Sequence, residues 1–98
     1  MSNYSLLDFL TEGEQNAKTA RELAQALGYD SIREVAAEIA RLRKAGTIIC
    51  SVTDTATKGN FLPANSEDVK RFVRRTEFRI RETERMLKPA KDHLQSEA

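Results

Sequence analysis

Apolar side chains recur along this chain at spacings that alternate between helical and extended. Spacing of three and four residues, typical of one face of a helix, occurs in four stretches: residues 6–10, 20–27, 32–45 and 66–88. Between the last two, Ile48, Ile49 and Val52 indicate a β-strand rich in branched side chains. A polar turn over 54–59 and a return strand over 60–63 complete a hairpin. The pattern predicts a mainly α fold with a small β-hairpin and a long C-terminal helix.

Two of the predicted helices begin with the same pair of residue types. Thr19 is followed three residues later by Glu22, and Ser31 is followed by Glu34. In such a capping box the hydroxyl accepts from the Glu amide while the carboxylate accepts from the amide of the capping residue. Gly28 suits the left-handed backbone that ends a helix. A short Gly-Tyr-Asp turn is therefore expected to join two helices in close succession.

The helix predicted at 32–45 divides into two faces when it is drawn with 3.6 residues per turn. The apolar face, expected in the core, consists of Ile32, Val35, Ile39 and Leu42. The opposite face consists of Arg33, Ala37, Ala40, Arg41 and Lys44. Small residues between basic ones would allow a close approach to a nucleic-acid groove, and the alternative is an ordinary solvated face.

The final helix is expected to begin at Asn65 or Ser66 and to carry a heptad seam. The seam consists of Val69, Val73, Thr76, Ile80, Thr83 and Leu87. It can pair with a second chain to form a homodimer, which we expect, or pack back onto its own core. Pro89 lacks a backbone donor and is predicted to kink or stop the helix, so we expect the helix over 66–88 and a frayed tail over 89–98.

Composition narrows the possible functions. The 98 residues include 16 Lys and Arg against 15 Asp and Glu, so the net charge of +1 creates no large positive field. No apolar run reaches the length of a membrane span and no leader peptide is recognisable, so we expect a cytoplasmic protein. The single cysteine, Cys50, excludes an internal disulfide. One cysteine and one histidine, His93, are too few for the usual zinc sites or a catalytic pair, so we expect neither enzyme, metal nor cofactor.

Three segments together resemble the winged helix-turn-helix superfamily, in particular small bacterial and prophage-like regulators. They are Thr19-Ala-Arg-Glu-Leu-Ala-Gln-Ala-Leu-Gly28, Ile39-Ala-Arg-Leu-Arg-Lys-Ala-Gly46 and Lys58-Gly-Asn-Phe-Leu-Pro63. The resemblance covers residues 5–63 and implies a winged helix-turn-helix domain over 1–65, followed by the helix at 66–88. It also implies that the third helix enters the major groove of double-stranded DNA and that the hairpin forms a wing.

The resemblance and the helix faces together assign candidate DNA-binding residues. They are Lys18, Thr19, Arg21, Ser31, Arg33, Ala37, Arg41, Lys44 and Lys58. Arg33 is the candidate for reading a base edge, because Arg forms paired hydrogen bonds with guanine. For Thr19 and Ser31 helix capping is expected in any case. For Arg21, and for Arg43 on the helix at 32–45, the competing interpretation is an ion pair with a nearby carboxylate instead of a contact with DNA.

Three functional hypotheses follow. The first is sequence-specific DNA binding by a dimeric transcriptional regulator. The second is a protein-interaction module that uses this scaffold and its final helix to bind a protein partner without DNA. The third places the nucleic-acid contact on the cations of the final helix: Lys70, Arg71, Arg74, Arg75, Arg79, Arg81 and Arg85. Because Glu77, Glu82 and Glu84 lie at pairing distance from these cations, an ion-paired solvated helix is the competing interpretation.

Overall fold

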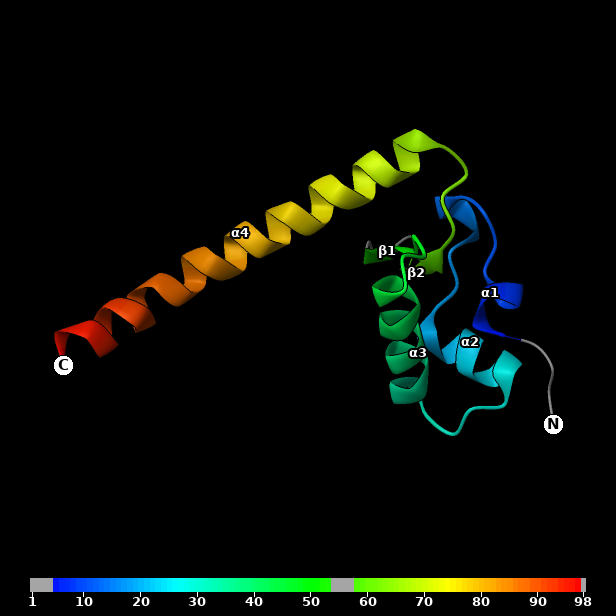
Figure 1. The fold of residues 1–98 in the computed structure, drawn as a ribbon, viewed down its shortest axis with the longest axis horizontal. Coiled ribbons are helices and arrows are strands. Elements are labelled where there is room, and N and C mark those ends of the chain that lie inside the picture. The colour runs from blue at the N-terminus through cyan, green and yellow to red at the C-terminus, as the bar shows by residue number, and fades with distance from the viewer. Residues whose placement is uncertain (1–4, 54–57, 98) are drawn as a thin grey trace.

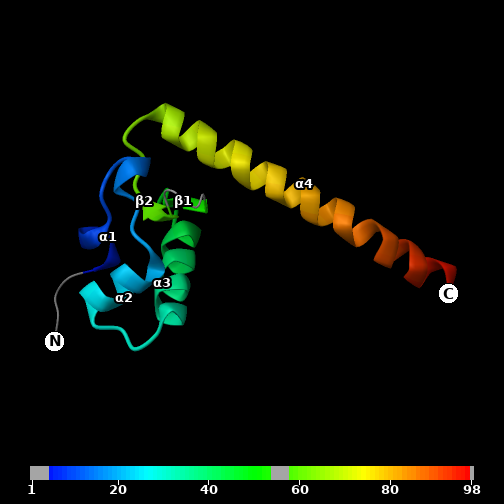
Figure 2. The same cartoon turned by 180° about the vertical axis from the view of Figure 1, so that it is seen from behind.

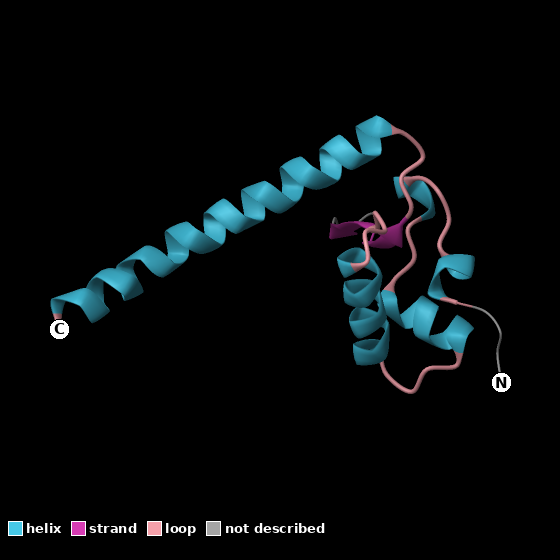
Figure 3. Cartoon of the chain, in the orientation of Figure 1, coloured by secondary structure: helices cyan, strands magenta, loops and turns pink. Residues whose placement is uncertain are grey.

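The computed structural model describes residues 5–53 and 58–97. In chain order the elements are α1 (Leu6–Phe9), a 3₁₀ turn η1 (Glu14–Asn16), α2 (Ala20–Leu27), α3 (Ile32–Lys44), β1 (Cys50–Thr53), β2 (Lys58–Phe61) and α4 (Ser66–Ser96). The fold is mainly helical, with one antiparallel hairpin and a long C-terminal helix, as the pattern predicted (Figures 1 and 3). Helices α1 to α3 and the hairpin form one body, from which α4 extends.

Capping chemistry sets the start and end of α2 as predicted. The Glu22 amide donates to Thr19 Oγ1 over 3.1 Å, and Glu22 Oε1 accepts from the Thr19 amide over 3.2 Å. Gly28 ends the helix in the left-handed conformation, with φ 74°. The second predicted capping box does not form, because the Ser31 side chain makes no capping hydrogen bond. Its backbone is extended, as an N-cap requires, so α3 begins where expected without that side-chain bond.

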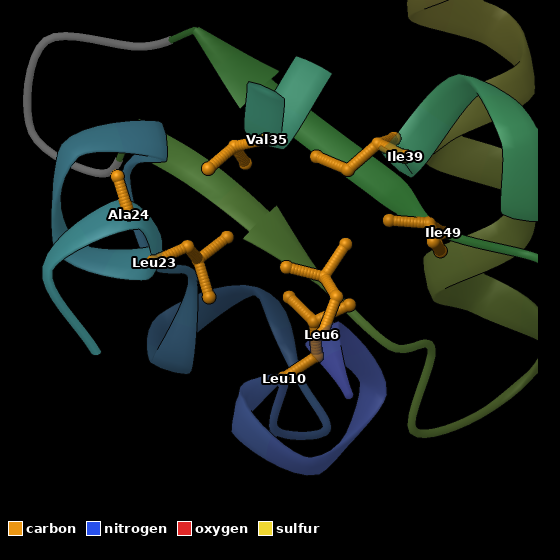
Figure 4. Close-up of a cluster of buried hydrophobic side chains, with 7 residues drawn as sticks. All are labelled: Leu6, Leu10, Leu23, Ala24, Val35, Ile39 and Ile49. Atoms are coloured by element: carbon orange, nitrogen blue, oxygen red, sulfur yellow. The ribbon is translucent and has the colours of Figure 1, made fainter. Parts of the chain in front are cut away.

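The main core lies where α1, α2 and α3 meet the chain entering β1. Its buried side chains, drawn in Figure 4, are Leu6, Leu10, Leu23, Ala24, Val35, Ile39 and Ile49. Leu42 packs against this cluster from α3, so three of the four predicted apolar positions of that helix contribute. Ile32 was wrongly predicted to be core, since 57% of it is exposed. It is the first residue of α3, and no described part of the chain covers it.

The hairpin pairs Cys50 with Phe61 and Thr53 with Lys58. Cys50, Val52 and Phe61 form a second buried cluster. The strand starts at Cys50, so the prediction that it includes Ile48 was wrong: Ile48 is exposed in the loop before it. This loop leads the chain from the end of α3 into the sheet.

A short extended segment before α2 lies beside the hairpin. Lys18 exchanges backbone hydrogen bonds with Asn60, at 2.9 and 2.7 Å. Gly59 permits this close approach, because a Cβ there would lie 2.2 Å from the Lys18 carbonyl oxygen. Its φ of 128° also favours glycine. The hairpin is thereby attached directly to the start of α2.

Asn65 caps the start of α4: its side-chain oxygen accepts a hydrogen bond from the Asp68 amide over 3.1 Å. Phe72 packs against the buried hairpin cluster. The C-terminal part of the helix projects away from the rest of the molecule, as Figures 1 and 2 show from opposite sides. The chain consequently measures 55 × 32 × 28 Å along its principal axes.

The predicted end of this helix at Pro89, and with it the non-helical tail over 89–98, was wrong, because α4 continues to Ser96. Proline removes one helical hydrogen bond, the one to the carbonyl of Arg85. Residues 77–97 are exposed, so water can reach that carbonyl and compensate for the lost bond. The heptad spacing therefore continues on the same helix through Ala90 and Leu94.

Candidate nucleic-acid interface

The face of α3 that points away from the core carries small side chains between basic ones. Ala37, Ala40, Arg41 and Lys44 line a shallow, open cleft of about 440 Å³. All four are exposed, and so is Arg33, one turn before Ala37. The structure therefore gathers on one accessible surface the residues that the sequence placed on this face.

One cation of this face is already neutralised within the helix. The Arg41 guanidinium donates to both carboxylate oxygens of Glu38, at 3.1 and 2.5 Å. These hydrogen bonds lower the pKa of Glu38, so the carboxylate stays charged and holds the arginine. In the part of the chain described, neither Arg33 nor Lys44 makes an ion pair. Arg33 and Lys44 are the cations of α3 free to meet an incoming anion.

Two predicted site residues serve the fold. The Lys18 ammonium donates to the Phe9 carbonyl oxygen over 2.7 Å in a half-buried position. The Thr19 hydroxyl accepts the Glu22 amide and donates to the Glu22 carboxylate at 3.1 Å. Lys18 therefore links α1 to the start of α2 and lies apart from the exposed face of α3.

The hairpin and the start of α2 share a second concave surface. A cleft of about 280 Å³ is lined by Thr19, Ala20, Ser51, Val52, Thr53, Lys58, Gly59 and Asn60. The structure thus brings Thr19 and Lys58 together although they lie far apart in sequence. Lys58 is exposed at the start of β2. Residues 54–57 of the predicted turn lie outside the described residues.

Arg21 and Ser31 lie at the N-terminal ends of α2 and α3. Both are exposed. The predicted ion pair of Arg21 is not found among the described residues. Because Ser31 makes no capping hydrogen bond, its hydroxyl is free to bind another group near the amide-rich end of α3.

Arg43 has a structural role that sequence reasoning missed. An ion pair with a carboxylate was expected, but its Nε and Nη2 donate to the Ile49 carbonyl oxygen, at 3.0 and 2.6 Å. The guanidinium also lies over the Phe72 ring, 5.3 Å from its centroid. Burial lowers the pKa of this arginine. Arg43 thus ties the end of α3 to the loop before β1 and to α4, three segments that no local pattern connects.

The seam of α4 is covered only at its start. Val69 and Thr76 are half-buried, and with Val73, Ile48 and other residues they line a groove of about 500 Å³ between α4 and the loop after α3. Further along, Ile80, Thr83 and Leu87 are exposed. One part of the seam therefore packs back onto the chain, and the rest remains accessible.

Reactive groups do not converge in the described part of the chain. Cys50 is fully buried, and burial raises the pKa of its thiol. His93 lies on the exposed end of α4, where its Nε2 is 3.0 Å from Glu97 Oε1. Over residues 5–53 and 58–97, no three His, Cys, Asp or Glu side chains are placed to hold a metal ion.

Comparisons with protein-family models, with curated proteins and with solved structures gave no match. Within the described ranges, no helix has both the length and the apolar character needed to cross a membrane.

Proposed function

We propose that this protein binds double-stranded DNA in a sequence-specific manner, as a dimeric, non-enzymatic transcriptional regulator of the cytoplasm built on a winged helix-turn-helix. Residues 20–61 contain a short helix, a tight turn, a longer helix and a hairpin in that order. This order is the one in which winged helix-turn-helix proteins present a recognition helix to the major groove. In this proposal α3 is the recognition helix and the hairpin is the wing.

The observation that carries the proposal is the exposed cleft of α3. On this face Ala37 and Ala40 lie between Arg33 and the cations Arg41 and Lys44, and all five residues are exposed. Arg and Lys side chains bind phosphates, and Arg also reads base edges in the major groove. The alternation of exposed cations with alanine leaves room for a groove to approach this face.

The proposal gives each residue a distinct role. Arg33, in the first turn of α3, reads a base edge through paired hydrogen bonds to guanine. Lys44 and Lys58 contact phosphates, and Arg41 does so by exchanging Glu38 for a phosphate oxygen. Ser31 contributes its free hydroxyl, together with the amides that begin α3.

The exposed seam of α4 supports the dimer. The continued helix presents Ile80, Leu87 and Leu94 at seven-residue intervals, all of them exposed. Because water exposure of such a stripe is unfavourable, pairing with a second α4 would bury it. Two recognition helices would then address half-sites separated by about one turn of DNA, ~34 Å.

The test is fluorescence anisotropy of a labelled random-sequence duplex titrated with the protein at several salt concentrations. Binding through phosphates makes the logarithm of the affinity fall linearly with the logarithm of salt, by about 0.9 per phosphate contacted. A preferred site is then selected from a random pool. On that site, Arg33→Ala is expected to cost about 1–3 kcal/mol, and clearly less on random sequence.

Lys91→Ala is the matched control, because it removes one exposed, unpaired cation of the described chain from the far end of α4. It should leave the difference between preferred and random duplexes unchanged. Equal loss on both duplexes for Arg33→Ala would remove its base-reading role. Absence of binding at low salt by the folded protein would contradict the proposal as a whole.

A second function has one observation in its favour. Phe78, Met86 and Leu94 are large, apolar and exposed on α4. A helix that presents such side chains is suited to a groove on a protein partner. This interaction module without DNA binding becomes the better account if the folded protein binds no duplex at low salt.

A further inference from the structure

A cleft beside the hairpin combines positive charge with an exposed aromatic ring. It measures about 490 Å³ and lies between the end of β1 and one face of α4. Its lining consists of Thr53, Arg74, Arg75, Phe78, Arg79 and Glu82. Three arginines, one phenylalanine and one glutamate therefore line the cleft together with Thr53.

Two of these arginines are uncompensated. Most cations of α4 are paired along the helix: Lys70 with Glu67, Arg71 with Asp68, Arg81 with Glu77, Arg85 with Glu82 and Lys88 with Asp92. Arg74 and Arg79 make no such pair within residues 5–53 and 58–97. The lone carboxylate of the cleft, Glu82, is already engaged 2.7 Å from Arg85 Nη1. The cleft therefore carries net positive charge, although the chain as a whole is nearly neutral.

Arg75 adds donors that nothing in the described chain uses. Its Nη1 lies 2.8 Å from Glu14 Oε1, which ties α4 to η1. The contact is an ion pair by distance, but its angles are not those of a hydrogen bond, so Glu14 Oε1 counts among the buried atoms without a hydrogen-bond partner. The Nε and Nη2 of Arg75 are likewise buried without an acceptor in the described chain. Because these nitrogens are buried, a phosphate in the cleft would meet the exposed Arg74 and Arg79 rather than the free donors of Arg75.

The position of the cleft links it to the proposed wing. Thr53 lines it from β1 and pairs in the hairpin with Lys58. The exposed seam residues Ile80 and Leu87 lie on roughly the opposite side of α4 from Phe78, since a helix turns once in 3.6 residues. A molecule bound in the cleft and a second copy of the chain on the seam therefore do not compete for one face.

We propose that this cleft is a second DNA-binding site, which holds backbone phosphates of the duplex next to the stretch contacted by α3 and the hairpin. Arg74 and Arg79 bind phosphate oxygens through their paired N–H groups. Phe78 supplies apolar surface for the adjoining deoxyribose. The inference rests on the proposed function and extends it, because it gives α4 a role in binding DNA in addition to pairing.

The test compares two double variants with the wild-type protein in the anisotropy titration on the random duplex. Arg74→Ala/Arg79→Ala removes the two uncompensated cations of the cleft. Arg81→Ala/Lys88→Ala removes the same charge from the same helix, but from side chains that are ion-paired with Glu77 and Asp92, neither of which lines the cleft. All four side chains are exposed, so both variants are expected to fold, which far-UV circular dichroism verifies.

The cleft variant should lower the salt slope by about 2 and weaken binding roughly 10- to 100-fold at 0.1 M salt, since two phosphate contacts are lost. The control variant should change the slope by much less. If the cleft variant has the affinity and the salt slope of the wild type, this inference is overturned and the proposed function still stands. Equal weakening by both variants would also overturn it, by showing a general charge effect.

Failure of the proposed function gives a different result, since the wild-type protein would then bind no duplex in any salt. The last comparison measures binding of the same protein to a single-stranded oligonucleotide. If the wild type prefers the single strand to the duplex and Phe78→Leu abolishes that preference, the cleft stacks bases, and the duplex form of the inference is overturned.

Discussion

The two ends of this molecule use the same apolar residue types in opposite ways. In the body formed by residues 5–65, Leu6, Leu23 and Phe61 are completely buried. On α4 beyond Thr76, Phe78, Ile80 and Leu94 are each more than half exposed. Hydrophobicity alone therefore does not predict burial. An apolar side chain is buried only where the topology supplies a second surface, and residues 77–96 of α4 meet no such surface in the described part of the chain.

The projecting helix is stabilised instead by local interactions. Its ion pairs join residues three or four positions apart, and exposed pairs of this kind contribute about 0.3–0.5 kcal/mol each. In proteins, most of the stability of a helix comes from tertiary packing of its amphipathic face. This difference between the two regions is the one expected if α4, as proposed, pairs with a second chain.

The largest expected difference in stability is between two phenylalanine variants, one in each region. Phe61→Ala removes a fully buried ring and should lower the free energy of unfolding by about 3–5 kcal/mol. This loss is a large share of the stability of a small domain, so a substantial fraction of the molecules should be unfolded. Phe78→Ala removes a ring that is 58% exposed and should change stability by less than about 0.5 kcal/mol. Chemical denaturation followed by circular dichroism measures both. Similar losses would show that the two regions do not differ as described.

Two carboxylates introduced on the seam should dissociate the proposed dimer without unfolding the body of the chain. In Ile80→Asp/Leu87→Asp, dimer formation would bury unpaired carboxylates, which weakens association by more than about 100-fold. Sedimentation velocity should show a dimer for the wild type and a monomer for the variant, with an unchanged denaturation midpoint at low protein concentration. A wild type that is monomeric at high concentration would contradict pairing through the seam.

Pro89 tests whether the end of α4 is an independent helix. A proline inside a helix costs about 3 kcal/mol relative to alanine, so Pro89→Ala should stabilise the turns around it by up to about that amount. Amide hydrogen exchange of residues 90–96 should become slower, and the unfolding of the body should not change. Unchanged exchange would indicate that a partner, rather than the backbone, holds this segment.

The smallest effect is expected at the junction of the two regions. Asp68 is only 4% exposed. The Ala64 amide, hydrogen-bonded to its carboxylate over 2.9 Å, lowers its pKa, and Arg71 lowers it further. The folded pKa lies below the unfolded value of about 3.9. The carboxylate therefore stabilises the fold above that pH, and this contribution is lost as pH falls through the folded pKa.

Asp68→Asn should accordingly be less stable than the wild type at neutral pH, and the gap should narrow below about pH 4. Denaturation midpoints measured from neutral to acidic pH test this. A gap that stays constant with pH would mean that the carboxylate charge does not anchor α4.

Much of this architecture was predictable because it depends on neighbours in sequence. Thr19, Glu22 and Gly28 define α2 through bonds within one helix, and Val35 and Ile39 follow the helical period. The exposed face of α3 was predictable for the same reason. Local patterns place side chains relative to their own helix.

The features that sequence reasoning missed depend on contacts between elements. Arg43 over Phe72 requires knowing that α4 crosses the end of α3. Ile32 has the right periodicity but lies where nothing covers it. The cleft at Phe78 likewise needs β1 and α4 side by side, so charge counting along α4 could not separate free arginines from paired ones.

The central claim is that α3 presents a DNA-binding surface, and amide chemical-shift mapping of isotope-labelled protein tests it most directly. With a random duplex at low salt, the largest shifts should fall at Arg33, Ala37, Lys44 and Lys58, with a second group around Arg74 and Arg79. Residues of α1 should be unaffected. Shifts confined to the seam of α4, or no shifts at all, would contradict the account and point to a protein partner.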